Sequence, residues 1–127
     1  MPLIKEIQEK LLFYAKKINA PKSLIPLINE TNDLAYPYIE IDDSGLLYFV
    51  IRERGVEYER RLVAREEDLF YLIFSKITFS MASQFELENR IESQDSRKLI
   101  FEKQIELLKT LDEEWAKREN WYNRNNV

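Results

Sequence analysis

Carboxylates are the side chains most available for chemistry in this chain, because its 127 residues include no histidine and no cysteine. Histidine is the side chain that most often transfers protons near neutral pH, and it is also the commonest transition-metal ligand. The absence of cysteine excludes disulfides, thiolate nucleophiles and the usual structural zinc sites. An enzyme of this composition would have to use carboxylates, lysine, tyrosine or hydroxyl groups.

The carboxylates occur close together along the chain, as Asp42-Asp43, Glu57 and Glu59, Glu66-Glu67-Asp68, and Glu113-Glu114. General acid–base catalysis requires two carboxyl groups that face each other across a cleft and have well-separated pKa values. Neighbouring carboxylates on a turn or a helix surface do not provide this arrangement. We therefore interpret these groups as solvated surface or helix-capping residues.

Other motifs for catalysis or cofactor binding are also incomplete. The turn sequence Asp42-Asp43-Ser44-Gly45 lacks the alternating oxygen ligands and the distal glutamate of a calcium loop. Ser80 and Ser83 lie in a helical pattern without a histidine to activate them, so we interpret them as packing residues. The chain has only two glycines, which excludes a glycine-rich phosphate loop. We expect no catalytic residue, no metal and no cofactor.

Charged residues of both signs are concentrated between residues 52 and 66. Arg52, Arg54, Arg60, Arg61 and Arg65 lie among Glu53, Glu57, Glu59 and Glu66. We predict that most of these side chains pair with one another, and contact with a partner is the alternative. The net charge of −4 disfavours nonspecific binding to nucleic acid and suits either solubility or a basic protein partner. Arg90 and Arg97 flank a polar break, and we predict that each holds a carboxylate of the hairpin.

Strand patterns occupy the middle of the sequence. Residues 36–41, 46–53 and 56–63 are rich in aromatic and β-branched residues, and turn sequences separate them. Arg54-Gly55 predicts a two-residue hairpin loop. In that register Glu53 opposes Val56, Arg52 opposes Glu57 and Ile51 opposes Tyr58, whereas a bulged loop would shift the pairing by one residue.

Helical periodicity flanks the strands. Residues 3–18 carry apolar residues on one helical face, and Leu69 to Ile91 reads as a helix that is apolar almost all round in its first half. Asp95 or Ser96 is expected to cap a last helix that continues through Trp115. The predicted fold class is α+β, with an N-terminal helix, a three-stranded antiparallel β-meander and two long C-terminal helices packed on the sheet. By length, residues 1–127 form one domain.

The longest apolar run, Leu69 to Phe74, is too short to span a bilayer, and the first residues contain no signal-peptide core. We expect a cytoplasmic protein without a membrane partner. Nothing in the sequence indicates the oligomeric state.

The order of several short motifs resembles the immunity protein 63 family of bacterial polymorphic toxin systems. The motifs are Glu53-Arg54-Gly55 with Glu57, Asp68-Leu69, Met81-Ala82, Glu86-Leu87, Asn89-Arg90, Arg97, Phe101, Gln104 with Leu107-Leu108, and Trp115. The resemblance covers roughly residues 36 to 118. The chain departs from the pattern at Lys98, where a second arginine is usual, and at Ala64-Arg65, where a threonine usually leads into the helix.

The resemblance implies a small cytoplasmic protein that binds a cognate toxin domain and blocks it without catalysis. The matching positions, which either hold the fold or contact the partner, are Glu53, Arg54, Gly55, Glu57, Arg90, Arg97, Gln104 and Trp115. Candidate contacts specific to the toxin are Asn29, Asp33, Asp42 and Asp43, in two loops.

Two other hypotheses remain open at this point. An enzyme or nucleic-acid-handling protein would need a cleft into which Glu53, Glu57, Arg90 and Arg97 converge. A non-catalytic subunit or scaffold would bind a partner that is not a toxin.

Overall fold

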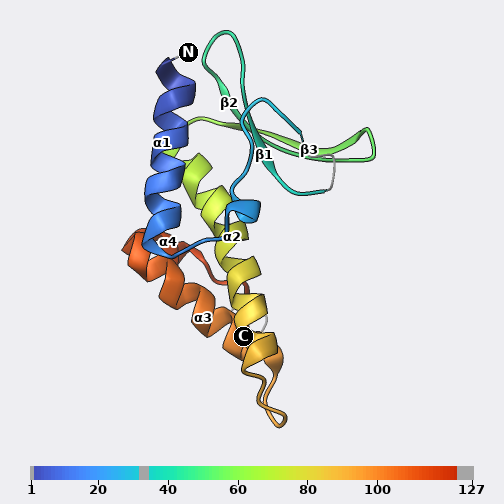
Figure 1. Ribbon diagram of the computed structural model, residues 1–127, viewed down its shortest axis with the longest axis vertical. Coiled ribbons are helices and arrows are strands. Elements are labelled where there is room, and N and C mark those ends of the chain that lie inside the picture. Colours follow the sequence, from blue (N-terminus) through green and yellow to red (C-terminus); the bar gives the residue numbers. More distant parts are fainter. Residues whose placement is uncertain (1, 32–34, 123–127) are drawn as a thin grey trace.

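The computed structural model describes residues 2–31 and 35–122. Along the chain it contains α1 (Pro2–Lys17), the 3-10 turn η1 (Lys22–Leu24), β1 (Tyr38–Ile41), β2 (Leu47–Glu53), β3 (Val56–Val63), α2 (Glu66–Glu88), α3 (Ser96–Leu111) and α4 (Glu113–Arg118). The strands form an antiparallel meander in the order β1-β2-β3. This confirms the predicted α+β architecture (Figure 1).

The hydrophobic core lies between one face of the sheet and the helices. Ile39, Ile41, Leu47 and Phe49 of β1 and β2 are buried on the same side, as the two-residue period of a strand requires. Helix α2 lies against β2 and β3 on this side, and α3 packs along α2. In Figure 1, α1 runs beside the first half of α2.

Helix α2 is the central element of the fold. Its N-terminal half buries Leu69, Phe70, Ile73, Phe74 and Ile77, which confirms the prediction of a helix that is apolar almost all round. Its first turn is acidic, as the partial positive charge of a helix N-terminus favours. The helix ends at Glu88, three residues before the predicted boundary, and the Asn89 side chain donates a hydrogen bond to the Phe85 carbonyl (2.9 Å).

The C-terminal helix is interrupted, although a continuous helix through Trp115 was predicted. Asp95 caps α3 as expected, and its carboxylate accepts a hydrogen bond from the Arg97 backbone N–H (3.0 Å). At Asp112 the backbone becomes extended, with φ −166° and ψ 121°. The Asp112 carboxylate then caps α4 by accepting from the backbone N–H groups of Glu114 (2.8 Å) and Trp115 (3.3 Å). This break turns the chain so that Trp115 enters the core.

The two edges of the sheet differ. The segment before β1 forms a parallel bridge with it, in which the Asn29 N–H donates to the Ile39 carbonyl (2.7 Å) and the Ile39 N–H donates to the Leu27 carbonyl (2.9 Å). Strand β3 forms the other edge, and most of its residues are exposed. Among the described residues, no helix is both long enough and apolar enough to cross a lipid bilayer.

Candidate functional site

The β2–β3 hairpin carries four of the motif residues. Arg54 and Gly55 form its two-residue loop with φ values of 51° and 80°, which is the backbone of a type I′ turn and confirms the predicted loop. The expected oppositions of Glu53 to Val56 and of Arg52 to Glu57 are confirmed. The third expected pair is wrong, because a bulge places Ile51 opposite Glu59 and leaves Tyr58 as the extra residue of β3.

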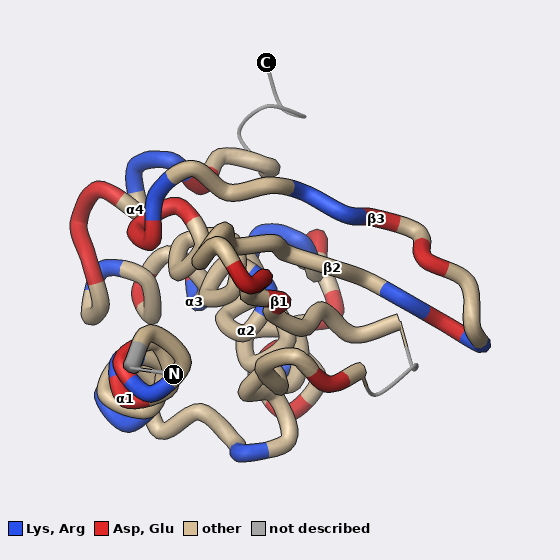
Figure 2. The backbone as a smooth tube through the Cα atoms, turned by 90° about the horizontal axis from the view of Figure 1, so that it is seen from above, with Lys and Arg blue, Asp and Glu red and all other residues tan. Residues whose placement is uncertain are grey.

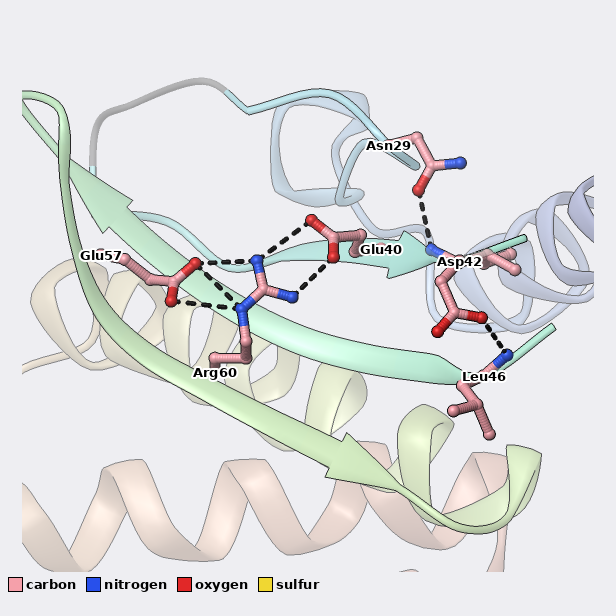
Figure 3. Close-up of polar contacts among 7 residues, drawn as sticks. Asn29, Glu40, Asp42, Leu46, Glu57 and Arg60 are labelled. Carbon is pink, nitrogen blue, oxygen red and sulfur yellow. Dashed lines mark hydrogen bonds and ion pairs between the residues drawn. The ribbon is translucent and has the colours of Figure 1, made fainter. Parts of the chain in front are cut away.

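An ion-pair network crosses the outer face of the sheet, which is the face turned away from the helices. The Arg60 guanidinium of β3 contacts Glu40 of β1 (2.6 Å) and Glu57 (2.8 Å), as Figure 3 shows. It also lies 5.3 Å from the centre of the Tyr48 ring of β2. Hydrogen bonds from Arg60 lower the pKa of Glu57, and the two carboxylates raise that of Arg60. The network joins all three strands.

The charges of the hairpin are therefore paired largely within the chain, as predicted. Arg61 contacts Glu59 (3.1 Å) and Arg65 contacts Asp68 (3.4 Å). Figure 2 shows positive and negative residues interspersed along β2 and β3. These pairs are exposed to solvent, which screens the attraction between the charges, so the network mainly fixes the positions of the side chains.

Two of the candidate partner-contact residues shape the loops in which they lie. The Asn29 side-chain oxygen accepts from the Ile41 N–H (2.7 Å), and Asn29 has a positive φ of 58°, which asparagine tolerates (Figure 3). The Asp42 carboxylate accepts from the N–H groups of Ser44 and Leu46 (both 2.9 Å). Asp43 is exposed at the tip of the same turn. Asp33 lies outside the described residues.

Arg90 and Arg97 lie at the connection between α2 and α3, at the far end of the molecule from the sheet (Figure 1). Arg90 pairs with Glu86 one helical turn before it, with two contacts of 3.0 Å, and Arg97 pairs with its neighbour Asp95 (3.0 Å). The prediction that Arg90 and Arg97 each hold a carboxylate of the hairpin is wrong. Both arginines pair with nearby acids, and the hairpin lies too far away for its carboxylates to reach them. In each pair the arginine lowers the pKa of the carboxylate.

The Glu86–Arg90 pair makes the stability dependent on pH. The Glu86 side chain is only 3% exposed, whereas that of Arg90 is 57% exposed. Because Arg90 lowers the pKa of Glu86 below its ordinary value of 4.5, the pair stabilises the fold above that pH. The stabilisation is lost as the pH falls through the lowered pKa. We expect Arg90→Gln to destabilise the chain at pH 7, and the difference from wild type to shrink toward pH 3.

Urea unfolding of wild type and Arg90→Gln at several pH values measures this difference. Arg97→Gln is the matched control, since it breaks a pair whose carboxylate is exposed, and its effect at pH 7 is expected to be smaller. A constant difference between wild type and Arg90→Gln from pH 7 to pH 3 would contradict the role of the Glu86 carboxylate.

Gln104 and Trp115 are buried in the helical layer. The Gln104 amide donates to the Ser75 carbonyl (3.0 Å) and accepts from the Trp121 indole N–H (2.6 Å). The Trp115 ring stacks on Phe74, with 6.1 Å between centroids, and contacts Tyr14 at 5.2 Å. Both motif residues therefore hold helices together in this structure. Whether any of the motif residues also contacts a partner stays a prediction.

Glu53, Glu57, Arg90 and Arg97 do not converge on a shared cleft. Glu53 and Glu57 lie on the hairpin, whereas Arg90 and Arg97 lie at the opposite end of α2. The carboxylates of Glu57, Asp68, Glu86 and Asp95 have pKa values lowered by arginines, which is opposite to the shift that a general acid requires. In the described part of the chain, no group of three or more acidic side chains is arranged to hold a metal ion.

A cleft that sequence reasoning missed lies at the other end of α2. It has a volume of about 490 Å³, and residues of α1, of the start of α2 and of the α3–α4 junction line it. Its most exposed aromatic residue is Phe13, 58% exposed, beside Tyr14 (5.7 Å between ring centroids). The sequence feature that could have indicated this cleft is Phe13, an aromatic residue that falls outside the apolar face expected for the helix of residues 3–18.

Part of the chain is similar to a known protein family. A family model described as immunity protein 63 matches residues 43–123, from the β1–β2 turn through the last helix. No curated protein and no solved structure shows significant similarity to the chain.

Proposed function

The chain belongs to the immunity protein 63 family of bacterial polymorphic toxin systems, and we propose that it binds a cognate toxin domain and neutralises it by protein–protein contact, without catalysis. The observation that carries this proposal is the family match over residues 43–123, which includes the hairpin, α2, α3 and α4. Immunity proteins are typically non-catalytic. We further propose that the protein meets its toxin in the cytoplasm of the cell that makes both.

The charge of the chain supports a partner with a basic face. The net charge is −4 and the calculated isoelectric point is about 5.0. Complementary charge increases the rate at which two proteins associate and disfavours wrong partners. A toxin whose active site attracts an anionic substrate would present such a basic face.

The size of the molecule is compatible with a standard interface. Stable complexes bury about 800 Å² on each partner, and the accessible surface of this chain is 8095 Å². About a tenth of the surface would therefore be covered. We propose that the turn containing Asp42 and Asp43, and the adjacent Asn29, lie within that area. Asp43 is the candidate whose carboxylate extends from the turn into solvent.

Co-expression tests the proposed function. The toxin domain encoded next to this chain is produced in a host cell with and without it, and growth is measured together with co-purification. We expect the chain to restore growth and to form a stable complex with the toxin domain. Failure of both would reject the proposal. A stable complex with a neighbouring gene product that is not toxic would favour the alternative of a scaffold or non-catalytic subunit.

A further inference from the structure

The cleft beside α1 has an aromatic wall made by three helices. Tyr14 of α1 contacts Phe13 (5.7 Å), Phe70 of α2 (5.6 Å) and Trp115 of α4 (5.2 Å), measured between ring centroids. All four side chains line the cleft. Packing with Phe74 and Trp115 holds the inner rings, whereas Phe13 forms the exposed rim. The ammonium group of Lys17 lies 4.7 Å from the centre of the Phe13 ring, so this ring already makes a cation–π contact in the free protein.

The charged side chains of the cleft leave an unpaired carboxylate. Lys10, Glu66, Glu67 and Asp112 complete the lining, so acids outnumber bases. Lys10 pairs with Glu66, and Asp112 caps α4 through two backbone N–H groups. Within the described part of the chain, the Glu67 carboxylate has no hydrogen bond or ion pair. The cleft therefore places a free negative charge beside exposed aromatic surface.

We propose that this cleft is the binding site for an arginine side chain presented by the toxin domain, an inference that rests on the proposed function. A guanidinium group stacks on aromatic rings through its planar faces and binds a carboxylate through two parallel N–H groups. The rings of Phe13 and Tyr14 supply the stacking surface and Glu67 supplies the carboxylate. A lysine ammonium would satisfy the charge but would not stack in this way.

The position of the cleft fits a single interface with the proposed contact turn. Leu3 of α1 lies beside Gly45 of the β1–β2 turn. Phe13 follows Leu3 by ten residues, which is about 15 Å along a helix. A partner that covers about 800 Å² of this chain can reach both places. Helix α1 precedes the matched residues 43–123. The cleft residues that come from α1 therefore lie outside the family match, whereas those from α2 and α4 lie inside it.

A titration without the toxin tests the chemistry of the cleft. N-acetyl-arginine amide is added at tens of millimolar to the full chain, and the NMR shifts of backbone amides and of the Trp115 indole are followed. N-acetyl-citrulline amide, which has the same shape but no charge, is the control probe. We expect shifts at Phe13, Glu67 and Trp115 with the arginine probe only, and weaker ones in Glu67→Gln. No shifts at the cleft, or equal shifts with the citrulline probe, would overturn the inference.

Affinity for the toxin domain tests the role of the cleft in the complex. Phe13→Ala and Glu67→Gln are each expected to weaken binding about tenfold, which corresponds to about 1.4 kcal/mol. Ile91→Ala and Glu102→Gln remove an exposed apolar residue and an exposed acid elsewhere, and are expected to leave binding unchanged. If wild type binds and the cleft variants bind equally well, the inference is wrong and the proposed function stands. If wild type does not bind the toxin while the arginine probe fills the cleft, the proposed function fails instead.

Discussion

Replacing Trp115 by alanine is expected to lower the free energy of unfolding by about 3–5 kcal/mol. The side chain is 2% exposed, and its ring packs between Phe74 of α2 and Tyr14 of α1. Removing it leaves a cavity where α1, α2 and α4 meet, and the surrounding rings can collapse into it only partly. Chemical denaturation of wild type and variant, followed by circular dichroism, measures the loss.

Leu87→Ala is the matched control for this cavity. Leu87 lies on α2 but is 60% exposed, so truncating it is expected to change stability by about 0.5 kcal/mol or less. A Trp115→Ala variant as stable as Leu87→Ala would show that Trp115 does not hold the three helices together. The family resemblance would then leave contact with the partner as the more reasonable role for this position.

Local sequence patterns predicted the elements whose determinants lie within a few residues of one another. The Arg54-Gly55 pair specifies a loop with two positive φ values, and residue types that fit this loop can be read directly from the chain. The cap at Asp95 follows from the same kind of local chemistry. These features were predicted correctly because they depend on backbone conformation and hydrogen bonds within a few residues of the sequence.

The features that were predicted wrongly are those for which two arrangements of the chain have similar energies, or for which a local and a distant partner compete. A bulge at Tyr58 and a regular ladder satisfy nearly the same hydrophobic pattern, so the register beyond Arg52 was not determined by the sequence. Asp112 fits a helix surface as well as a helix cap, and the packing of Trp115 favours the cap. Arg90 and Arg97 pair with Glu86 and Asp95 and not with the predicted hairpin carboxylates, because an acid two to four residues away is within reach whatever the tertiary fold.

The candidate surface was less predictable than the fold. The Arg60 network requires Glu40, twenty residues away, and the strand order brings the two together across β2. The cleft requires Phe13, Glu67 and Asp112 to meet, and no local pattern relates these positions. Sequence periodicity shows which residues leave the apolar face, but only the packing of three helices shows that they line one cleft.

Replacing Gln104 by leucine is the second change expected to have a large effect, with a loss of about 3 kcal/mol in unfolding free energy. The side chain is 1% exposed, and its amide reaches the Ser75 carbonyl (3.0 Å), the Thr78 hydroxyl (3.4 Å) and Glu119 (3.3 Å), while it accepts from Trp121 (2.6 Å). Leucine fills a similar volume but pairs with none of these groups. Each buried polar group left without a partner costs about 1–3 kcal/mol.

Thermal unfolding of Gln104→Leu and of Gln84→Leu separates this network from the general effect of adding a leucine. Gln84 lies on the exposed surface of α2 and donates to Glu88 (3.3 Å), so its replacement is expected to be nearly neutral. Toxin binding by Gln104→Leu, measured well below its unfolding temperature, then distinguishes the two roles of a motif residue. Unchanged affinity together with lost stability means that Gln104 joins α2, α3 and the segment after α4. Lost affinity in a chain as stable as Gln84→Leu would mean that the position acts on the partner.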